Sequence, residues 1–420
     1  MTEKQILAAL QIESNEVRLV VGEFFNTRLN ILKRECVPCK GMDGIRIVDQ
    51  KAVAGAIREA VNNITAHLGV PVESVLLAIP SYRFKRETRT FSKVIESGDR
   101  RVSIDDIRDI YQRALSVNVG SDVEIINVTS TSFRANGIVY RRMPIGEMCD
   151  VLEADVDLLC CDKMITYDYA GVVESAGLKI IDVYLDNYSL AKEAALFEQT
   201  MRTYMLAIQL EKQHTLFTLI YDGRIVTSEN ENLGYEALAK PIVEKFNLPE
   251  RHSTRLLLKY AELDKTSFND RPMHVWSINQ EQRSFTDRQL FETVKDAADS
   301  LADDFMNLCG PILNLSAVTV IVAGDGADIA GIDKLFARKF GKQVKCYYPE
   351  TLGVRSAKMA VCLGMFYAYI DQQEIHAYDT CSVNMEAYQK HINEKVESEV
   401  SEEGFTARLK NMLFTNQKNS

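Results

Sequence analysis

The stretch Leu10-Gln11-Ile12-Glu13 decides the fold, because a second version of it stands at Ile208-Gln209-Leu210-Glu211. An apolar strand follows each copy, ending at Val21-Gly22-Glu23 in the first and at Ile220-Tyr221-Asp222-Gly223 in the second. Each unit has the pattern of strand, tight turn, strand, short loop, strand and amphipathic helix. Two copies about 200 residues apart predict a duplicated α/β architecture.

Length and composition indicate a soluble protein of several domains. The chain has 420 residues, of which 46% are hydrophobic and 26% charged, which suits two to four globular domains. The net charge of −10 argues against a nucleic-acid-binding surface. The sequence contains no apolar run of 18 residues that could span a bilayer. The first residues lack a signal-peptide pattern, so we expect a cytoplasmic protein.

The cysteines and histidines do not form a recognisable metal or catalytic pattern. Nine cysteines without a framework predict reduced thiols. The motif Cys36-Val37-Pro38-Cys39 has no second pair at zinc spacing, so a plain loop is favoured over a metal site. The six histidines are dispersed, and no Ser-His-Asp or Cys-His arrangement can be argued. We therefore expect no metal site and no catalytic residues of these kinds.

The first half of the chain predicts one half-domain with an insertion. Three strands over 6–35, a helix over 50–68 and a buried strand at 75–80 form the half-domain. The composition then changes. Residues 81–162 predict a small α+β insertion, with exposed strands over 84–100, a helix capped by Ser103 that runs to Leu115, and a hairpin at Asn136-Gly137.

The second half repeats the strand pattern and adds helices. The expected elements are listed in chain order: a helix over 165–176, a strand over 179–185, a helix over 190–198, a strand meander over 203–230, mostly helix over 235–308 with a hairpin near 272–286, a strand at 318–322, a helix through 340 and a final helix over 357–369. The stretch Ala323-Gly324-Asp325-Gly326-Ala327 connects the last strand to its helix. From Glu394 to Glu403 the chain is rich in glutamate, which predicts a solvated linker.

The last residues have a different character. Phe405, Leu409, Met412 and Leu413 fall at i, i+4, i+7 and i+8 and share one helical face, with Phe414 next to it and Arg408 and Lys410 beside it. No acidic residue follows Glu403. A short basic amphipathic helix suits an anionic membrane surface. A terminal helix that docks on its own core or in a partner's groove would show the same pattern, and the residues alone leave both interpretations open.

Taken in order, these motifs resemble those of FtsA, the actin-like bacterial division proteins that anchor FtsZ to the membrane. The motifs of the resemblance are listed in order: the first phosphate loop at 10–23, a Gly-x-Ile-Val stretch at Gly44 to Val48, the adenosine loop at 318–332, and the following Leu352-Gly353-Val354-Arg355. The resemblance runs along essentially the whole chain. Each motif alone is weak, and their order is the specific part.

The resemblance implies an actin-like, ribonuclease H-like duplicated ATPase fold of the α/β class, with an inserted SHS2-type α+β subdomain. The implied domains are listed in chain order: 1A in a first part (1–80), the inserted 1C (81–162), the second part of 1A (163–202), the first part of 2A (203–230), 2B (231–308), the completion of 2A and 1A with the adenosine-type loop (309–370), an acidic linker (371–403) and a membrane-targeting amphipathic helix (404–420).

The expected nucleotide cleft is degenerate in this sequence. Family members carry Asp-apolar-Gly at each phosphate turn, where the aspartates hold Mg²⁺ and the glycines admit phosphate to the backbone N–H groups. The residues that replace them here are listed by turn: Gln11, Glu13, Ser14 and Arg18 in the first, and Gln209, Glu211 and Lys212 in the second. A like charge about 4 Å from a phosphate costs on the order of a few kcal/mol at an intermediate dielectric, against about 8 kcal/mol for micromolar binding.

These replacements predict a pseudo-ATPase, which binds no cofactor and does not hydrolyse ATP. Arg18 or Lys212 would hold the cleft shut by hydrogen bonding to the glutamates. Two alternatives stay open. In the first, ATP with Mg²⁺ still binds, as the family implies, and Glu13 and Glu211 are new Mg²⁺ ligands. In the second, the adenosine-type loop still binds the adenine base, because it keeps Gly324 and Gly326.

The partners follow from the resemblance. It implies self-association into filaments through 1C, a peripheral position on the cytoplasmic face of the membrane at the division site, and binding of the FtsZ tail near a 2B helix at about 287–308. That helix carries Arg288 at its start and Lys295 in its middle, with Ala297 near where the family has an arginine. We expect the apolar positions of the helix to be core residues, namely Leu290, Phe291, Val294, Ala298 and Leu301.

Two rival functions remain. One is an active nucleotide phosphohydrolase or a sugar-kinase relative, which would need acidic residues that reach the cleft from elsewhere in the chain. The other is a pilus-assembly scaffold of the PilM type, which shares the fold and the insertion. The basic amphipathic terminus favours FtsA over PilM.

Overall fold

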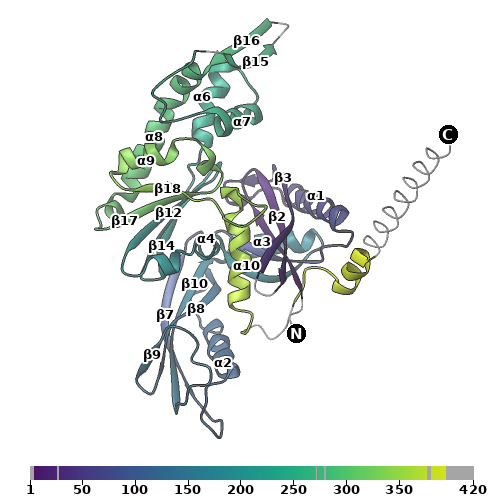
Figure 1. Ribbon diagram of the computed structural model, residues 1–420, viewed down its shortest axis with the longest axis vertical. Coiled ribbons are helices and arrows are strands. Elements are labelled where there is room, and N and C mark those ends of the chain that lie inside the picture. The colour runs from purple at the N-terminus through teal and green to yellow at the C-terminus, as the bar shows by residue number, and fades with distance from the viewer. Residues whose placement is uncertain (1–3, 26–27, 271, 279–280, 376–379, 394–420) are drawn as a thin grey trace, which may run out of the picture.

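The computed structural model describes residues 4–25, 28–270, 272–278, 281–375 and 380–393. Two sheet-containing lobes lie side by side in the middle of an elongated molecule (Figure 1). A helical subdomain with a hairpin extends from one lobe at the top, and the inserted subdomain 1C hangs below (Figure 1). Buried residues form three hydrophobic cores, one in each lobe and one in 1C.

Lobe I is built on a five-stranded sheet of order β11-β6-β1-β2-β3. Its strands are β1 (Gln5–Ile12), β2 (Glu16–Phe25), β3 (Arg28–Pro38), β6 (Ser74–Ile79) and β11 (Lys179–Leu185). Helices α1 (Gln50–Leu68) and α3 (Lys163–Ser175) pack together on it, as do α4 (Asp186–Glu193) and α10 (Ala360–Asp371). A two-stranded ribbon, β4 (Met42–Asp43) and β5 (Arg46–Ile47), precedes α1.

Lobe II repeats the same order, β14-β13-β12-β17-β18, with an antiparallel meander followed by parallel strands. Its strands are β12 (Tyr204–Leu210), β13 (Thr215–Tyr221), β14 (Arg224–Glu231), β17 (Val318–Ala323) and β18 (Val344–Cys346). The remaining elements are α6 (Glu236–Phe246), α7 (Glu250–Tyr260), β15 (Pro272–Ile278), β16 (Glu281–Thr286), α8 (Asp287–Leu313) and α9 (Ile332–Phe340). The duplicated architecture predicted from the sequence is therefore confirmed.

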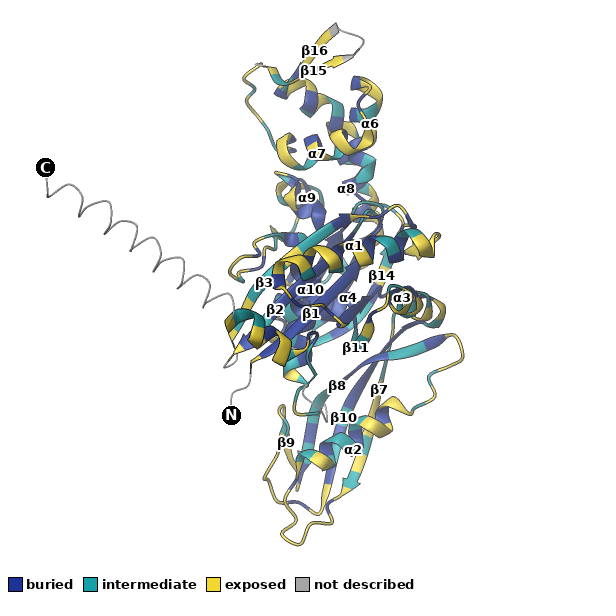
Figure 2. Ribbon diagram, turned by 90° about the vertical axis from the view of Figure 1, so that its right-hand side faces the viewer, coloured by how far each residue is buried: buried dark blue, intermediate teal, exposed yellow. Residues whose placement is uncertain are grey.

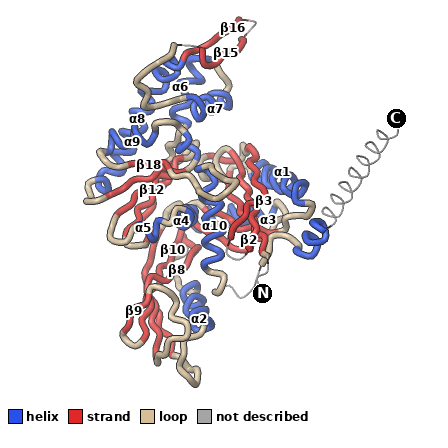
Figure 3. Tube along the Cα trace, viewed as in Figure 1, coloured by secondary structure: helices blue, strands red, loops and turns tan. Residues whose placement is uncertain are grey.

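Subdomain 1C has one helix against a sheet of order β7-β10-β8-β9 (Figure 3). Its elements are β7 (Lys85–Val94), α2 (Ile104–Leu115), β8 (Val123–Ala135), β9 (Ile138–Tyr140) and β10 (Val151–Asp162). Ser103 caps α2 in a capping box with Asp106, as its sequence predicts. The hairpin at Asn136-Gly137 is also confirmed, because both residues have positive φ angles.

An additional tie joins 1C to lobe II. Arg224 of β14 pairs with the buried carboxylate of Asp157 on β10, and its Nε lies 2.8 Å from Asp157 Oδ2. Arg86 on β7 donates a hydrogen bond of 2.7 Å to the carbonyl oxygen of Ile225. Although 1C is inserted in lobe I, it therefore braces the opposite lobe.

One predicted helix is divided in two. The sequence predicts a helix over 190–198, whereas the structure has α4 ending at Glu193 and a separate short helix, α5 (Leu196–Gln199). Ala195 between them has a φ of 49°, a left-handed conformation that cannot continue a helix. Similarly, the expected final helix begins with a 3₁₀ turn, η2 (Ala357–Met359), before α10.

Residues 380–393, which we expected to lie in an acidic linker over 371–403, pack on lobe I instead. Ser382 is fully buried between the first residues of the parallel strands β1 and β6. Its N–H donates to Ile6 O at 2.8 Å, its Oγ accepts from Ala8 N at 2.7 Å, and its carbonyl accepts from Glu73 N at 2.8 Å. Residues 385–393 are helical. We call residues 380–393 the strap.

The strap satisfies backbone groups that the strands leave unpaired where they diverge, which is why acidic composition does not keep it in solvent. No helix in the described part of the chain is long and apolar enough to cross a membrane. The predicted membrane helix, 404–420, lies outside the described residues.

Candidate functional site

The two degenerate turns lie at the same end of the two equivalent strand pairs. The turn after β1 is closed by a backbone hydrogen bond from Glu13 N to Glu16 O at 2.9 Å, and the turn after β12 by Glu211 N to His214 O at 3.0 Å. Gln11 and Gln209, two residues before the glutamates, are buried, as are both glutamates themselves. The glutamine and the glutamate of each turn therefore lie in the protein interior.

Arg18 joins the two lobes through this interior. It lies on β2 directly opposite Gln11 of β1, and it is fully buried. Its NH2 atom lies 2.9 Å from Glu211 Oε2 and 3.1 Å from Asp325 Oδ2, and its Nε lies 2.8 Å from Glu16 Oε1. Burial disfavours the charged guanidinium, but the surrounding carboxylates outweigh it and raise the pKa of Arg18. The arrangement is an ion-pair latch across the lobes.

Lys212, the other cation proposed to reach the glutamates, points elsewhere. It pairs with Glu250 at the start of α7, and its Nζ lies 3.9 Å from Glu236 Oε1. Ser14, also predicted for the first turn, is buried, and its Oγ has no hydrogen-bond partner among the described residues. Of the two cations, Arg18 alone closes on Glu211.

Glu13, unlike Glu211, does not pair directly with Arg18. Gln11 Nε2 donates to Glu13 Oε1 at 2.6 Å, and His214 Nε2 lies 3.6 Å from the other carboxyl oxygen. Burial, and then the charge of Glu211, raise the pKa of Glu13 well above its ordinary value. Burial lowers the pKa of His214 to about 4. Burial therefore favours the neutral form of each group, and the Glu13 side chain occupies the space of the turn.

The glycines of the adenosine-type loop are packed against the second turn. Gly324 has a φ of 81°, and a Cβ there would lie 2.6 Å from Glu211 Oε1. A Cβ on Gly326 would lie 2.3 Å from Leu210 Cγ. Both positions therefore require glycine for contact with residues 210 and 211. The loop continues as a 3₁₀ turn, η1 (Asp325–Asp328).

Sequence reasoning missed two carboxylates of the cleft. Asp325 accepts a hydrogen bond of 3.2 Å from Tyr235 OH, and burial raises its pKa to about 6. Asp186 begins α4, where its Oδ1 accepts from the N–H of Ser81 at 2.9 Å and from the Ser81 hydroxyl, and burial raises its pKa to about 6 as well. The available signal for Asp186 was its place at the carboxyl end of a buried parallel strand.

The 2B helix, α8, is mostly core as predicted. Leu290, Val294, Ala298 and Leu301 are buried. Phe291 is only half-buried and lines a surface pocket, so the core assignment does not hold for it. Arg288 pairs with Asp270 at 2.8 Å and lies over the ring of Phe268.

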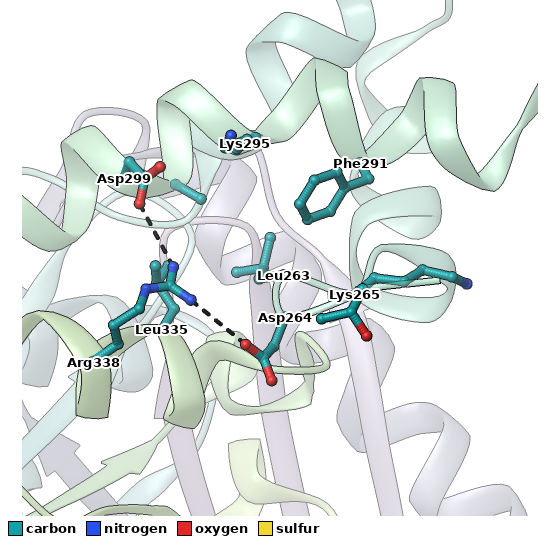
Figure 4. Close-up of a pocket in the computed structure, with 10 residues that line it drawn as sticks. Leu263, Asp264, Lys265, Phe291, Lys295, Asp299, Leu335 and Arg338 are labelled. Atoms are coloured by element: carbon teal, nitrogen blue, oxygen red, sulfur yellow. Dashed lines mark hydrogen bonds and ion pairs between the residues drawn. The ribbon is translucent and has the colours of Figure 1, made fainter. Parts of the chain in front are cut away.

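That pocket, of about 360 Å³, lies between α8, α9 and the loop after α7 (Figure 4). Phe291, Leu263 and Leu335 give it apolar walls, and Lys295 sits at its rim. Arg338 reaches across it, with NH1 3.5 Å from Asp264 Oδ1 and NH2 3.8 Å from Asp299 Oδ1. Within the described residues Lys295 has no ion pair, whereas Arg338 is already neutralised.

The remaining predictions concern the membrane-binding residues, the cysteines and metal ions. The membrane-binding residues lie outside the described residues; they are Phe405, Arg408, Leu409, Lys410, Met412, Leu413 and Phe414. All nine cysteines are described, and none of them forms a disulfide. Across the described residues, no group of three or more His, Cys, Asp or Glu side chains could hold a metal ion.

No family model matches the chain, and the similarity lies with individual proteins. The cell division protein FtsA of Enterococcus hirae is 21% identical, over 98% of both chains. FtsA of Streptococcus pneumoniae serotype 2 is 23% identical, over 86% of this chain and 79% of its own length. Among solved structures, the PilM-PilN type IV pilus biogenesis complex matches with a TM-score of 0.55 at 12% identity, over 88% of this chain and 98% of that chain.

Two equivalent sheets whose turns meet in a shared cleft define an actin-like protein. Within this class, several FtsA proteins match most of the chain at 21–23% identity. Over most of its length the chain is similar to the FtsA cell division proteins, which confirms the resemblance seen in its sequence.

Proposed function

We propose that this chain works in cell division as an FtsA-like scaffold that links a division partner to the membrane and does not hydrolyse ATP. The observation that carries the proposal is the ion-pair latch, in which the Arg18 guanidinium lies between Glu211 and Asp325 of the opposite lobe. A cation held there by carboxylates competes with a triphosphate for the space between the turns. The glutamate side chains also occupy the positions that glycine would leave open.

ATP turnover by the purified full-length protein tests this proposal. We expect no phosphate release above the buffer blank with Mg²⁺ present, and no change with Glu13→Ala. A turnover rate that Glu13→Ala removes would overturn the proposal, because Glu13 would then act in the reaction rather than obstruct it.

A second candidate function, an active phosphohydrolase or sugar-kinase relative, is favoured by one observation. Asp186 and Asp325 bring carboxylates into the cleft from elsewhere in the chain, which is what such an enzyme requires. Phosphate release that persists in Glu13→Ala and is lost in Asp186→Asn would favour this candidate. The assay above therefore separates the two functions with one additional variant.

The membrane role rests on the basic amphipathic segment 404–420. The strap supports it, because hydrogen bonds to β1 and β6 fix the chain 22 residues before that segment begins, at Ser382. Co-sedimentation of full-length and Δ404–420 protein with anionic liposomes tests the role. We expect the truncated chain to stay in the supernatant. Equal pelleting would contradict the tether and leave a PilM-type scaffold as the better interpretation.

The pocket beside α8 supports a role in holding the FtsZ tail. It offers the cation Lys295 next to the half-exposed ring of Phe291, a combination that suits a peptide with both carboxylate and apolar side chains. A labelled FtsZ C-terminal peptide from the same organism, followed by fluorescence anisotropy, tests this role. We expect Lys295→Glu to weaken binding at least tenfold and the matched variant Lys259→Glu, on the exposed side of α7, to leave it unchanged. Equal affinity of Lys295→Glu and the unaltered protein would exclude this pocket.

Self-association through 1C is supported by exposed apolar side chains at its edges. Val94, Ile138 and Val139 expose 60%, 57% and 62% of their surface, and β9 is an edge strand (Figure 2). Exposed apolar residues on an edge strand favour contact with another chain.

A further inference from the structure

A second pocket, of about 530 Å³, lies where the chain passes between the lobes. Its walls come from the end of α4, from α5, from the loop after β18 and from α10. Figure 3 shows α4, α5 and α10 close together at this junction. No residue of the two degenerate turns or of the latch lines this pocket, so it is separate from the cleft.

The pocket contains a buried carboxylate that lacks a cationic partner. Tyr347 OH lies 3.0 Å from the carbonyl oxygen of Glu193 and 3.4 Å from its Oε1, whereas Glu193 Oε2 is buried without a hydrogen-bond partner in the described structure. Neighbouring Lys192 does not neutralise it, because its Nζ binds Asp371 at 2.7 Å. Burial raises the pKa of Glu193 to about 7. A cationic side chain would supply the missing donor and charge.

An exposed apolar residue follows the pocket lining in the chain. Leu352 comes directly after the lining residue Thr351 and exposes 83% of its surface. A pocket with an unpaired carboxylate oxygen and an exposed apolar residue next to its lining fits a segment that carries both a basic and an apolar face.

The chain itself contains such a segment. Residues 404–420 carry Arg408 and Lys410 beside the face of Phe405 and Leu409, without any acidic residue, in a protein whose net charge is −10. We propose that the pocket between α4 and α10 binds the C-terminal segment of this chain when no membrane is present, with a cation of that segment on Glu193 and its apolar face on Leu352. This inference rests on the proposed membrane role of the segment. Membrane and pocket compete for one segment, so the pocket regulates membrane binding.

Carbodiimide cross-linking of the full-length protein tests the contact directly. The reagent joins a carboxylate to an adjacent amine, and we expect a cross-linked peptide between Glu193 and Lys410 by mass spectrometry. Anionic vesicles of phosphatidylglycerol should remove it, and neutral phosphatidylcholine vesicles should not. Absence of the cross-link without vesicles would overturn the proposal.

Liposome binding tests the consequence. At limiting anionic lipid, Glu193→Gln should raise the bound fraction at least threefold, and the matched variant Glu198→Gln on α5 should leave it unchanged. Leu352→Ser, at an exposed position that does not affect folding, should have the same effect as Glu193→Gln. Equal binding by all variants contradicts the competition. If the cross-link forms but no variant binds lipid, the membrane role fails while the pocket contact stands.

Discussion

At the scale of single residues, the main feature of the cleft is that its charged side chains are buried away from water. Arg18, Glu211 and Asp325 form a buried cluster in which each charge depends on the others. Removing one partner of such a cluster costs more than removing all of it, because an uncompensated buried charge remains. Water cannot compensate for the loss where the side chains are fully enclosed.

We therefore predict that Arg18→Met lowers the free energy of unfolding by about 3–5 kcal/mol. Urea denaturation at pH 7 measures this change. The triple variant Arg18→Met, Glu211→Gln, Asp325→Asn should recover most of the loss, since it leaves no charge unpaired. A single variant as stable as the original protein would show that the latch is not formed in solution.

Asp186 predicts a dependence on pH. Its pKa is raised by burial from an ordinary value of 3.8 to about 6, so the folded state binds more protons than the unfolded state between these values. Stability from this group is therefore full below pH 4 and lost as the pH rises through 6. The stability of the original protein relative to Asp186→Asn should fall by about 2–3 kcal/mol between pH 4 and pH 7.5. Urea midpoints at both pH values provide the measurement, and a constant difference would contradict it.

The sequence predicted which residues replace the phosphate-binding ones but not how they pair. From the sequence alone, Arg18 and Lys212 are equivalent candidates for pairing with the two glutamates. The strand register directs Arg18 inward opposite Gln11, whereas Lys212 lies near the start of α7 and finds Glu250 there. Asp186 was missed because Ser81, 105 residues away in the chain, holds it in place.

At the scale of elements, hydrophobic periodicity was sufficient to predict nearly all strands and helices. The two strand meanders and the helix cap at Ser103 follow from local sequence, since each depends on residues close in the chain. The failures depend on distant contacts. Composition suggested that the strap is solvated, yet its polar Ser382 is bound by the backbone of β1 and β6.

The third prediction concerns the contribution of the strap to stability. Truncation after residue 393 should leave the free energy of unfolding nearly unchanged, whereas truncation after 379 exposes the unpaired Ile6 carbonyl and the Ala8 and Glu73 N–H groups. Ser382→Ala alone should cost about 1–3 kcal/mol, because the buried Ala8 N–H loses its acceptor. Hydrogen exchange at Ala8 is the direct measurement, and Ser401→Ala provides the control. Unaltered protection of the Ala8 amide in Ser382→Ala would refute the role of this hydrogen bond.

At the scale of the whole molecule, ion pairs at two separate places help to hold the lobes together. The latch crosses the cleft, and the Asp157–Arg224 pair ties 1C to β14 of lobe II. An actin-like protein that needed nucleotide to bring its lobes together would require neither. The sequence suggested a closed cleft but not the second connection, because Asp157 and Arg224 lie in different predicted domains.

The fourth prediction concerns assembly. If side chains replace the nucleotide in holding the lobes, sedimentable assemblies of the full-length protein should form equally with ATP and after apyrase treatment. Val139→Asp on the edge strand of 1C should reduce the pelleted fraction at least fivefold, because an exposed charge interrupts an apolar contact. Gln112→Glu, at an exposed position of α2, is the matched control. Assembly that requires ATP would contradict the role given to the latch.

The position of Ser382 also has a mechanical consequence. If the proposed membrane attachment of the tail holds, tension on the tail enters the molecule at the strap. There it meets the middle of a sheet rather than an outer strand, with bonds to β1 and β6 loaded together. Such a joint resists peeling, so traction on the tail would be borne by the rigid centre of lobe I and passed along β1 toward Glu13.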